Sequence, residues 1–232
     1  LIGTAHISQK SVDLVEATIA QEMPDAVCIE LDDKRYNALT QKKRWETLDL
    51  KEVIRKKQLS TLLINMLMAS YQKKLGNKLG VAPGAELIAA ARTAQQHDIP
   101  VVLCDRDVRI TLRRAWKSTS FFKKGYLFAA LLGSFFDRTE VDEEKLSELK
   151  KKDVLEELMD EMGDTLPDVK RVLIDERDVY LAEKIRSCKA EKIVAVVGAG
   201  HVGGILKHLD IDNSNTMEEI SSIPPVSQIF KT

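Results

Sequence analysis

Residues 192–204, with the sequence KIVAVVGAGHVGG, decide the fold class of this chain of 232 residues. The run from Ile193 to Val197 is apolar at every position, and a glycine-rich turn follows it at once. A strand exposed on one face alternates polar and apolar side chains, so an unbroken apolar run is typical of the middle of a parallel sheet. The short helix that we expect next, to about Leu209, completes a strand-to-helix unit of an α/β protein.

Three more apolar runs, residues 1–5, 25–31 and 100–104, predict further strands. Between the first two runs, residues 12–23 carry apolar side chains at helical spacing, and Pro24 ends that helix. Strand, helix and strand in succession form a βαβ unit, which joins parallel strands. We therefore expect an α/β fold with a mostly parallel sheet flanked by helices.

Two long segments interrupt this pattern, and we predict helical insertions at about residues 34–80 and 109–165. We expect one domain over residues 1–209 and a linker over residues 210–232. The chain begins without Met and ends without a closing element, so we interpret it as part of a longer protein. The Lys and Arg clusters between residues 34 and 78 favour solvated helix faces, with a lid or a contact with a partner or a membrane surface as the alternative.

The composition limits the classes of partner. Lys and Arg number 35 against 36 Asp and Glu, so the net charge of -1 supplies no positive field for nucleic acid, and we expect no nucleic acid partner. No apolar run approaches the roughly 18 residues that span a bilayer, which favours a soluble domain. The three cysteines, Cys28, Cys104 and Cys188, have no close pair spacing and fit a reducing compartment, so we expect the domain to face the cytoplasm.

Polar residues follow the predicted strands where each strand ends. Ligands of open α/β sheets bind beyond the carboxyl ends of the strands, which makes these positions candidates for a site. Glu30 ends the second strand, and His6 and His201 end the first and the fourth, each in a Gly-x-x-His pattern. Two imidazoles and a carboxylate suit zinc, manganese or iron(II), and such an ion supports hydrolysis. The alternative is that each histidine caps an element or is a hydrogen-bonded core residue.

Four other residues are secondary candidates. Arg35, Arg106 and Arg177 carry planar guanidinium groups, which suit pairing with Glu30 or holding a substrate carboxylate. Glu86, just inside the helix predicted after Gly84, either caps that helix or faces the site.

Residues 198–203 also match Gly-x-Gly-x-x-Gly after a strand, which indicates nucleotide binding as a competing hypothesis. That fingerprint normally has an acidic residue about 20 positions later, at the end of the next strand. Asp210 and Asp212 come too soon and no strand is predicted after them, so nucleotide binding is the weaker interpretation.

An ordered set of short motifs extends from Gly3 to about Leu209 and resembles the TraB/PrgY family, the pheromone-shutdown proteins. The family is similar to the Tiki metalloproteases, whose activity is associated with two Gly-x-x-His motifs and a glutamate. The motifs are Gly3-Thr4-Ala5-His6-Ile7-Ser8, Ile29-Glu30-Leu31 with Arg35, Pro83-Gly84-Ala85-Glu86, Asp105-Arg106-Asp107 with Thr111-Leu112 and Arg114, Glu176-Arg177-Asp178, and Val196-Val197-Gly198-Ala199-Gly200-His201-Val202-Gly203-Gly204-Ile205.

The resemblance implies a metal site of His6, His201 and Glu30, loaded with manganese, or with cobalt or zinc in its place. It also implies a peptide ligand and membrane segments outside this fragment, so that the full-length protein is membrane-associated. Asp178 departs from the Asn of many relatives, which puts a substrate role for that position in doubt.

Two hypotheses of different classes follow. The first is a metal-dependent peptidase, in which Glu30 is a ligand or the general base and Arg106 or Arg177 orients the substrate. The second is a membrane-tethered module that sequesters a hydrophobic peptide and catalyses nothing. Residues 121–136 are apolar almost all round the predicted helix, so either the domain's own core or a second subunit must cover them, and we favour a homodimer.

Overall fold

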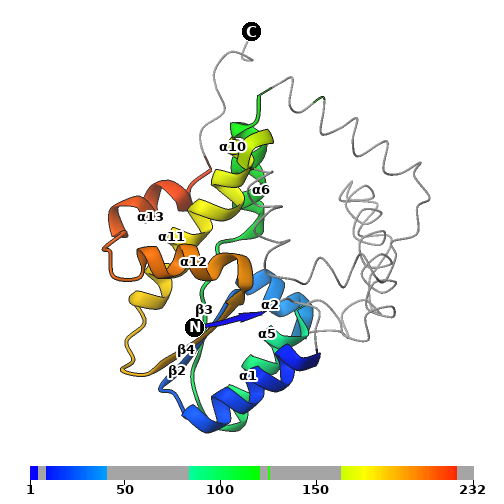
Figure 1. Cartoon of the computed structure of the whole chain (residues 1–232), viewed down its shortest axis with the longest axis vertical. Helices are drawn as coiled ribbons and strands as arrows, with labels where there is room; N and C mark the ends of the chain where they lie inside the picture. Colours follow the sequence, from blue (N-terminus) through cyan, green and yellow to red (C-terminus); the bar gives the residue numbers. More distant parts are fainter. Residues whose placement is uncertain (5–8, 41–83, 121–124, 126–162, 224–232) are drawn as a thin grey trace, which may run out of the picture. The chain divides into compact units, whose positions relative to one another are not determined.

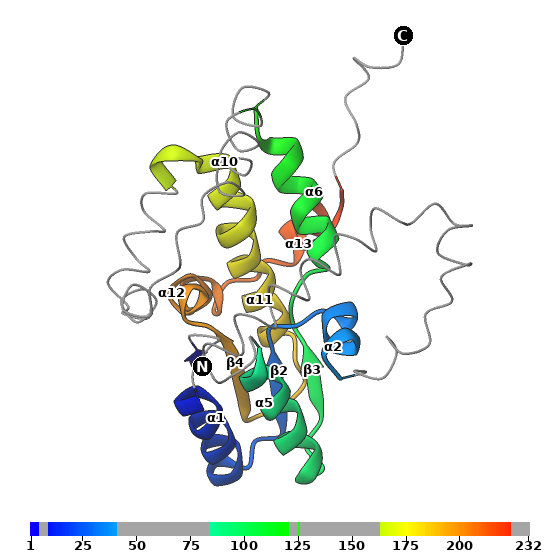
Figure 2. The same cartoon turned by 90° about the vertical axis from the view of Figure 1, so that its right-hand side faces the viewer.

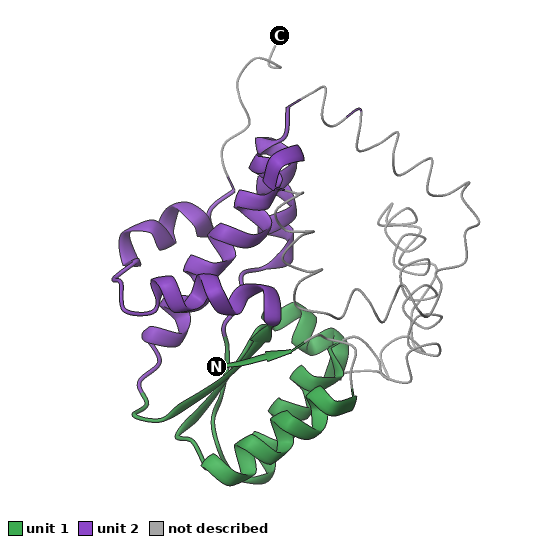
Figure 3. Ribbon diagram, in the orientation of Figure 1, with its two compact units in different colours: residues 1–103, 190–198 green, residues 104–189, 199–232 purple. Residues whose placement is uncertain are grey.

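The computed structural model of the chain describes residues 1–4, 9–40, 84–120, 125 and 163–223. The chain forms two compact units (Figure 3), which are described separately. Unit 1 consists of residues 1–103 and 190–198, and unit 2 consists of residues 104–189 and 199–232.

Unit 1 contains a parallel sheet of four strands in the order β1-β4-β2-β3. β4, the most apolar run of the sequence, pairs with two neighbours and is buried from Val194 to Gly198. The predicted α/β class with a parallel sheet is therefore confirmed. The strands are β1 (Ile2–Thr4), β2 (Ala26–Ile29), β3 (Val101–Leu103) and β4 (Ile193–Gly198).

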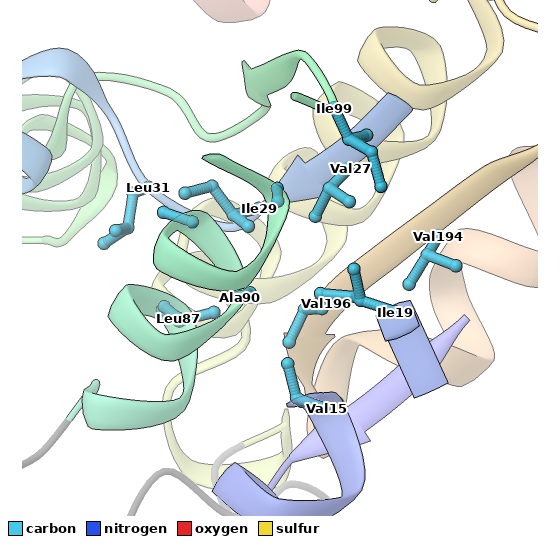
Figure 4. Packing of buried hydrophobic residues seen from close by; sticks show 12 residues of the cluster. Val15, Ile19, Val27, Ile29, Leu31, Leu87, Ala90, Ile99, Val194 and Val196 are labelled. Atoms are coloured by element: carbon cyan, nitrogen blue, oxygen red, sulfur yellow. The ribbon is translucent and has the colours of Figure 1, made fainter. Parts of the chain in front are cut away.

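The helices of unit 1 that the structure describes are α1 (Gln9–Glu22), α2 (Asp33–Thr40) and α5 (Ala85–Gln96). α1 and α5 lie side by side on one face of the sheet (Figures 1 and 2). Val15 and Ile19 of α1 point into the core beside Val196 of β4 (Figure 4). α5 begins after Gly84, whose φ of 79° lies in the left-handed region that favours glycine.

Unit 2 is helical in its described residues. One helix runs without interruption from Pro167 to Arg186, and its section from Arg171 to Asp175 is π-helical. The elements are α6 (Val108–Ser118), α10 (Pro167–Lys170), η2 (Arg171–Asp175), α11 (Glu176–Arg186), α12 (Ala199–His208) and α13 (Ser214–Ser221).

The segment expected to be a linker contains α13. Ile220 of this helix is only 3% exposed, so the helix is packed into unit 2. The sequence does not predict this helix, because it is short and mostly polar, with only Met217 and Ile220 as large apolar residues.

Several predictions lie outside the described residues. His6 is among them, as are most of the predicted insertions and, apart from Gly125, the apolar residues 121–136 on which the homodimer rests. No helix in the described part of the chain is long and apolar enough to cross a membrane.

Candidate functional site

Glu30 is fixed at the carboxyl edge of the sheet in unit 1. It follows the last residue of β2 and is 5% exposed. Its backbone N–H donates to the Val196 carbonyl at 3.1 Å, and its Oε2 accepts from the Gly198 N–H at 2.6 Å. The carboxylate is therefore held at the ends of β2 and β4, where the sequence predicts it.

A second carboxylate lies at the same edge. Thr4 pairs with Gly198, and its hydroxyl lies 3.3 Å from the Val197 carbonyl and 3.5 Å from Oε1 of Glu86. Glu86 is fully buried in the first turn of α5, where the helix dipole favours a negative charge. Glu86 thus faces the end of β1, and its role in substrate binding stays a prediction.

Arg35 is held at the start of α2. Its Nε donates to Oδ2 of Asp32 at 2.8 Å, and its side chain is 33% exposed. Oδ1 of Asp32 accepts from the backbone N–H groups of Lys34 and Arg35, which makes Asp32 the cap of this helix. Arg35 therefore contributes to a capping pair, and its binding of a substrate stays a prediction.

His201, in α12 of unit 2, is 6% exposed, and both of its ring nitrogens have partners. Nδ1 lies 2.6 Å from Oδ1 of Asp178, and Nε2 lies 2.9 Å from Nη1 of Arg177. An arginine can only donate, so Nε2 is the acceptor and the ring proton is on Nδ1, from which it is donated to Asp178. The neighbouring side chains thereby select one tautomer of the imidazole.

Arg177 is itself anchored by a carboxylate. Its Nε and Nη2 donate to the two oxygens of Asp105 at 3.1 and 2.6 Å, which is the bidentate geometry that guanidinium favours. The Arg177 side chain is 16% exposed. The hydrogen bonds thus form one chain from Asp105 through Arg177 and His201 to Asp178.

Asp178 is a site residue that the sequence placed in doubt. Burial raises the pKa of its carboxyl above the ordinary value, and the hydrogen bond from His201 acts in the opposite direction. The carboxylate packs so closely on Gly204 of α12 that a Cβ at this glycine would overlap it. The sequence signal for this pair was Gly204, three residues after His201, but a glycine indicates a close approach only once its partner is known.

Arg106 is enclosed in unit 2 and is 1% exposed. Its guanidinium donates to Glu176 at 2.8 Å, to Thr111 at 3.0 Å and to the carbonyls of Val172 and Ile220 at 3.1 and 2.7 Å. These bonds tie α6, η2, α11 and α13 together. The structure shows Arg106 as a buried residue that links these elements, and its role in orienting a substrate stays a prediction.

The residues of the expected metal site are only partly described. His6 lies outside the described residues, and Glu30 and His201 belong to different units. No three His, Cys, Asp or Glu side chains within the described ranges are grouped to hold an ion. The chemistry of His201 fits a ligand, because metal-binding histidines donate the other ring N–H to a carboxylate. Arg177 must release Nε2 first, since one lone pair cannot serve both.

The helices that follow β4 among the described residues do not support the nucleotide-binding hypothesis. α12 follows the glycine-rich turn, as a dinucleotide site requires. Among residues 199–223, however, α12 leads to α13, and no strand supplies the acidic residue that binds a ribose.

Comparisons with known proteins show which family this chain belongs to. A sequence model of the TraB/PrgY/gumN family matches residues 1–214. An uncharacterized protein of Methanocaldococcus jannaschii is 35% identical over 94% of this chain and 55% of its own length. The TraB domain-containing proteins of Mus musculus and Homo sapiens are 32% and 31% identical, over 98% of this chain and 66% of theirs. This chain therefore spans only 55% to 66% of the length of these relatives. The chain belongs to the TraB/PrgY/gumN family.

Proposed function

We propose that this chain is a metal-dependent hydrolase that acts on a peptide. The observation that carries the proposal is the 2.6 Å hydrogen bond between Nδ1 of His201 and Asp178. This bond keeps the proton on Nδ1 and leaves the lone pair on Nε2, which is the form in which histidine binds a metal. A histidine that only fills space needs no buried carboxylate behind it.

The residues have separate roles in this proposal. His201, Glu30 and His6 would hold the ion, and Asp178 would orient the His201 ring through its hydrogen bond to Nδ1. Such an ion, Mn²⁺ with Co²⁺ or Zn²⁺ in its place, would supply Lewis acidity toward water and a carbonyl. Glu30 would be a ligand or the general base. Arg177, anchored on Asp105, presents its Nη1 to a carboxylate of the substrate once it has left His201.

The proposal extends to the setting of the domain. The relatives continue beyond the length matched here, and we place a membrane anchor in that additional length, with this domain on the cytoplasmic side. We also propose that the chain forms a homodimer, and the support for it is the apolar composition of residues 121–136.

A second function is favoured by a different contact. The Arg177 N–H at 2.9 Å from Nε2 leaves His201 with both nitrogens satisfied by protein groups, as in a structural histidine. A peptide-sequestering module without catalysis accounts for this contact directly. The two functions differ in whether His201 binds a metal.

Metal binding by the purified chain separates the two. We expect calorimetry with Mn²⁺ to show one saturable site, which His201→Ala weakens by at least about tenfold. His97→Ala is the matched control, because His97 is an exposed histidine at the end of α5 and we expect it to leave the affinity unchanged. Absence of a saturable site, or equal weakening by both variants, would overturn the hydrolase proposal in favour of sequestration.

A further inference from the structure

Unit 2 contains a cavity of about 400 Å³ in a part of the molecule that the proposed hydrolase site does not use. α6, η2, α11 and α13 contribute to its walls. The polar and charged residues that line it, among the described residues, are Arg114, Lys117, Ser118, Arg171, Glu176 and Glu219.

Glu176, at the wall of this cavity, is outnumbered by the cations that contact it. It is 7% exposed, and three guanidinium groups donate to its two oxygens. Nη1 of Arg106 and Nε of Arg114 lie 2.8 Å from Oε2, and Nη1 of Arg171 lies 3.0 Å from Oε1. One negative charge therefore meets three positive charges in a largely buried position.

Other groups compensate this excess only in part. Nη1 of Arg114 donates to the carbonyls of Glu219 and Ser222 at 2.8 and 2.9 Å, at the end of α13 where the helix dipole is negative. The Glu219 carboxylate, 77% exposed and 3.9 Å from Arg114, adds little because water screens it. Burial lowers the pKa of Arg106, and the charge of Arg114 adds to that effect. Arg114 and Arg106 therefore repel each other, while the hydrogen bond with Glu176 raises the pKa of Arg114 above its ordinary value.

Two cations at the cavity have capacity for a further partner. The side chain of Arg171 is 52% exposed and uses Nη1 for Glu176. Lys117 is exposed on α6, and no carboxylate within the described ranges pairs with it. Both belong to the residues that line the cavity. An anion in the cavity would therefore find N–H donors from α6 and from η2.

We infer that this cavity binds a small molecule through a phosphate group. Arg114, Lys117 and Arg171 line the cavity, and Arg106, which does not line it, donates to the lining residue Glu176. This cluster of four positive side chains contains only two negative ones, Glu176 and Glu219, among the described residues. A phosphate group near pH 7 carries a charge of about -1.5 to -2, which matches the surplus better than the single charge of a carboxylate. The cavity lies within the roughly 300 to 1,000 Å³ of small-molecule sites, which leaves room for more than the phosphate itself.

The test uses calorimetry of the purified chain with inorganic phosphate, pyrophosphate and acetate as probes. We expect pyrophosphate to bind, phosphate to bind more weakly, and acetate to bind weakest. Lys117→Gln with Arg171→Gln should weaken pyrophosphate binding by at least about tenfold, because two charge-assisted contacts are lost. Lys117→Gln by itself leaves the contacts of Glu176 intact, so its smaller loss of several-fold is measured on an undisturbed fold.

Arg113→Gln is the matched control, since it removes one charge from α6 at an exposed position that does not line the cavity. It should change the affinity by less than about twofold. The inference is overturned if the chain binds no pyrophosphate at millimolar concentration. It is also overturned if acetate binds as tightly as phosphate, or if Arg113→Gln and Lys117→Gln weaken binding equally.

Discussion

Arg177 and Asp178 are adjacent in the chain, yet they contact opposite nitrogens of the same imidazole. Asp178 fixes the tautomer that suits a metal ligand, while Arg177 occupies the lone pair that a metal needs. The two residues therefore set the availability of His201 in opposite directions. The balance between the two proposed functions depends on how strongly Arg177 holds Nε2.

Removing the arginine should increase metal affinity. Arg177→Met frees Nε2, and an accompanying Asp105→Asn removes the buried carboxylate that Arg177 neutralises. A hydrogen bond from a charged donor contributes about 1.5 kcal/mol or more, so we expect the double variant to bind Mn²⁺ about tenfold more tightly, as measured by calorimetry.

The matched control changes an equivalent pair on the surface. Arg109→Met with Asp107→Asn removes a bidentate pair at the start of α6, in which the arginine side chain is 62% exposed. We expect this variant to bind metal like the wild type. Unchanged affinity in the Arg177 variant would show that Arg177 does not compete for His201.

Gly204 should tolerate no side chain. A Cβ at this position overlaps the Asp178 carboxylate, whereas a Cβ at Gly203, one residue earlier in α12, meets nothing within 4 Å. We expect Gly204→Ala to lower the free energy of unfolding by about 1 to 3 kcal/mol through overpacking. Gly203→Ala should raise it by up to about 1 kcal/mol, because alanine favours a helix.

Urea denaturation measures the free energy of unfolding of both variants. Each variant adds the same methyl group, so only the position in α12 differs. Equal effects at the two positions would mean that α12 does not pack on Asp178 as closely as the structure shows.

At the scale of the elements, the sequence predicts what depends on local periodicity. β4 is recovered within a residue and α5 begins after Gly84 as predicted, because an unbroken apolar run and a glycine before a helix are local signals. The π-helical turn η2 is not predictable in this way, since it changes the helical spacing without any Gly or Pro to mark it.

The residues of the candidate site differ in the same way: some are marked by a local sequence signal, and others depend on contacts between distant segments. Glu30 and His201 were found because a polar residue directly after an apolar strand is visible in the sequence. The Asp178 and Arg177 contacts depend on how the helix after η2 faces α12, which is a matter of packing between distant segments. The grouping of Arg106, Arg114 and Arg171 around Glu176 was not predicted for the same reason, because these residues come from separate segments of the chain.

The ion pairs of Glu176 with Arg106, Arg114 and Arg171 should make the free energy of unfolding depend on pH in the acid range. Burial tends to raise the pKa of Glu176, but hydrogen bonds from Arg114 and Arg106 outweigh it, so the pKa lies below the ordinary value of 4.5. With a depressed pKa in the folded state, the stabilisation is complete above the unfolded pKa and is lost as the pH falls through the folded value. The loss therefore occurs below about pH 4.5.

Glu176→Gln removes that dependence. We expect it to cost about 3 to 5 kcal/mol at pH 7, as for other broken buried ion pairs, and the cost to shrink as the pH falls below 4.5. Urea denaturation over this range measures it, with the 77% exposed Glu219→Gln as a control of small effect. A cost that is independent of pH would contradict the assignment of an ionised Glu176.

On the scale of the whole molecule, neither unit is a continuous stretch of chain. The chain passes between the units after residues 103, 189 and 198, so the last passage comes between the end of β4 and the helix that carries His201. Unit 2 is therefore completed only when residues 199–223 join residues 104–189. The C-terminal segment is consequently part of the folded structure of unit 2.

A truncation tests this role of the C-terminal segment. The carbonyls of Glu219, Ile220 and Ser222 accept from the buried guanidinium groups of Arg106 and Arg114. A chain that ends at Leu209 loses these three acceptors, and a buried charged donor left without its acceptor costs roughly 1 to 3 kcal/mol. It also loses Ile220, whose burial contributes about 2 kcal/mol.

We therefore expect the chain that ends at Leu209 to be less stable, by about 3 kcal/mol or more, than one that ends at Ile223. Both proteins lack residues 224–232, so urea denaturation of the pair isolates residues 210–223. Two proteins of equal stability would support the expectation of a linker, because a segment that merely connects domains contributes nothing to the free energy of unfolding. A further outcome is that truncation at Leu209 lowers the free energy of unfolding by no more than Ile220→Ala does. That result would assign the stabilisation to the apolar packing of Ile220 and not to the arginine contacts.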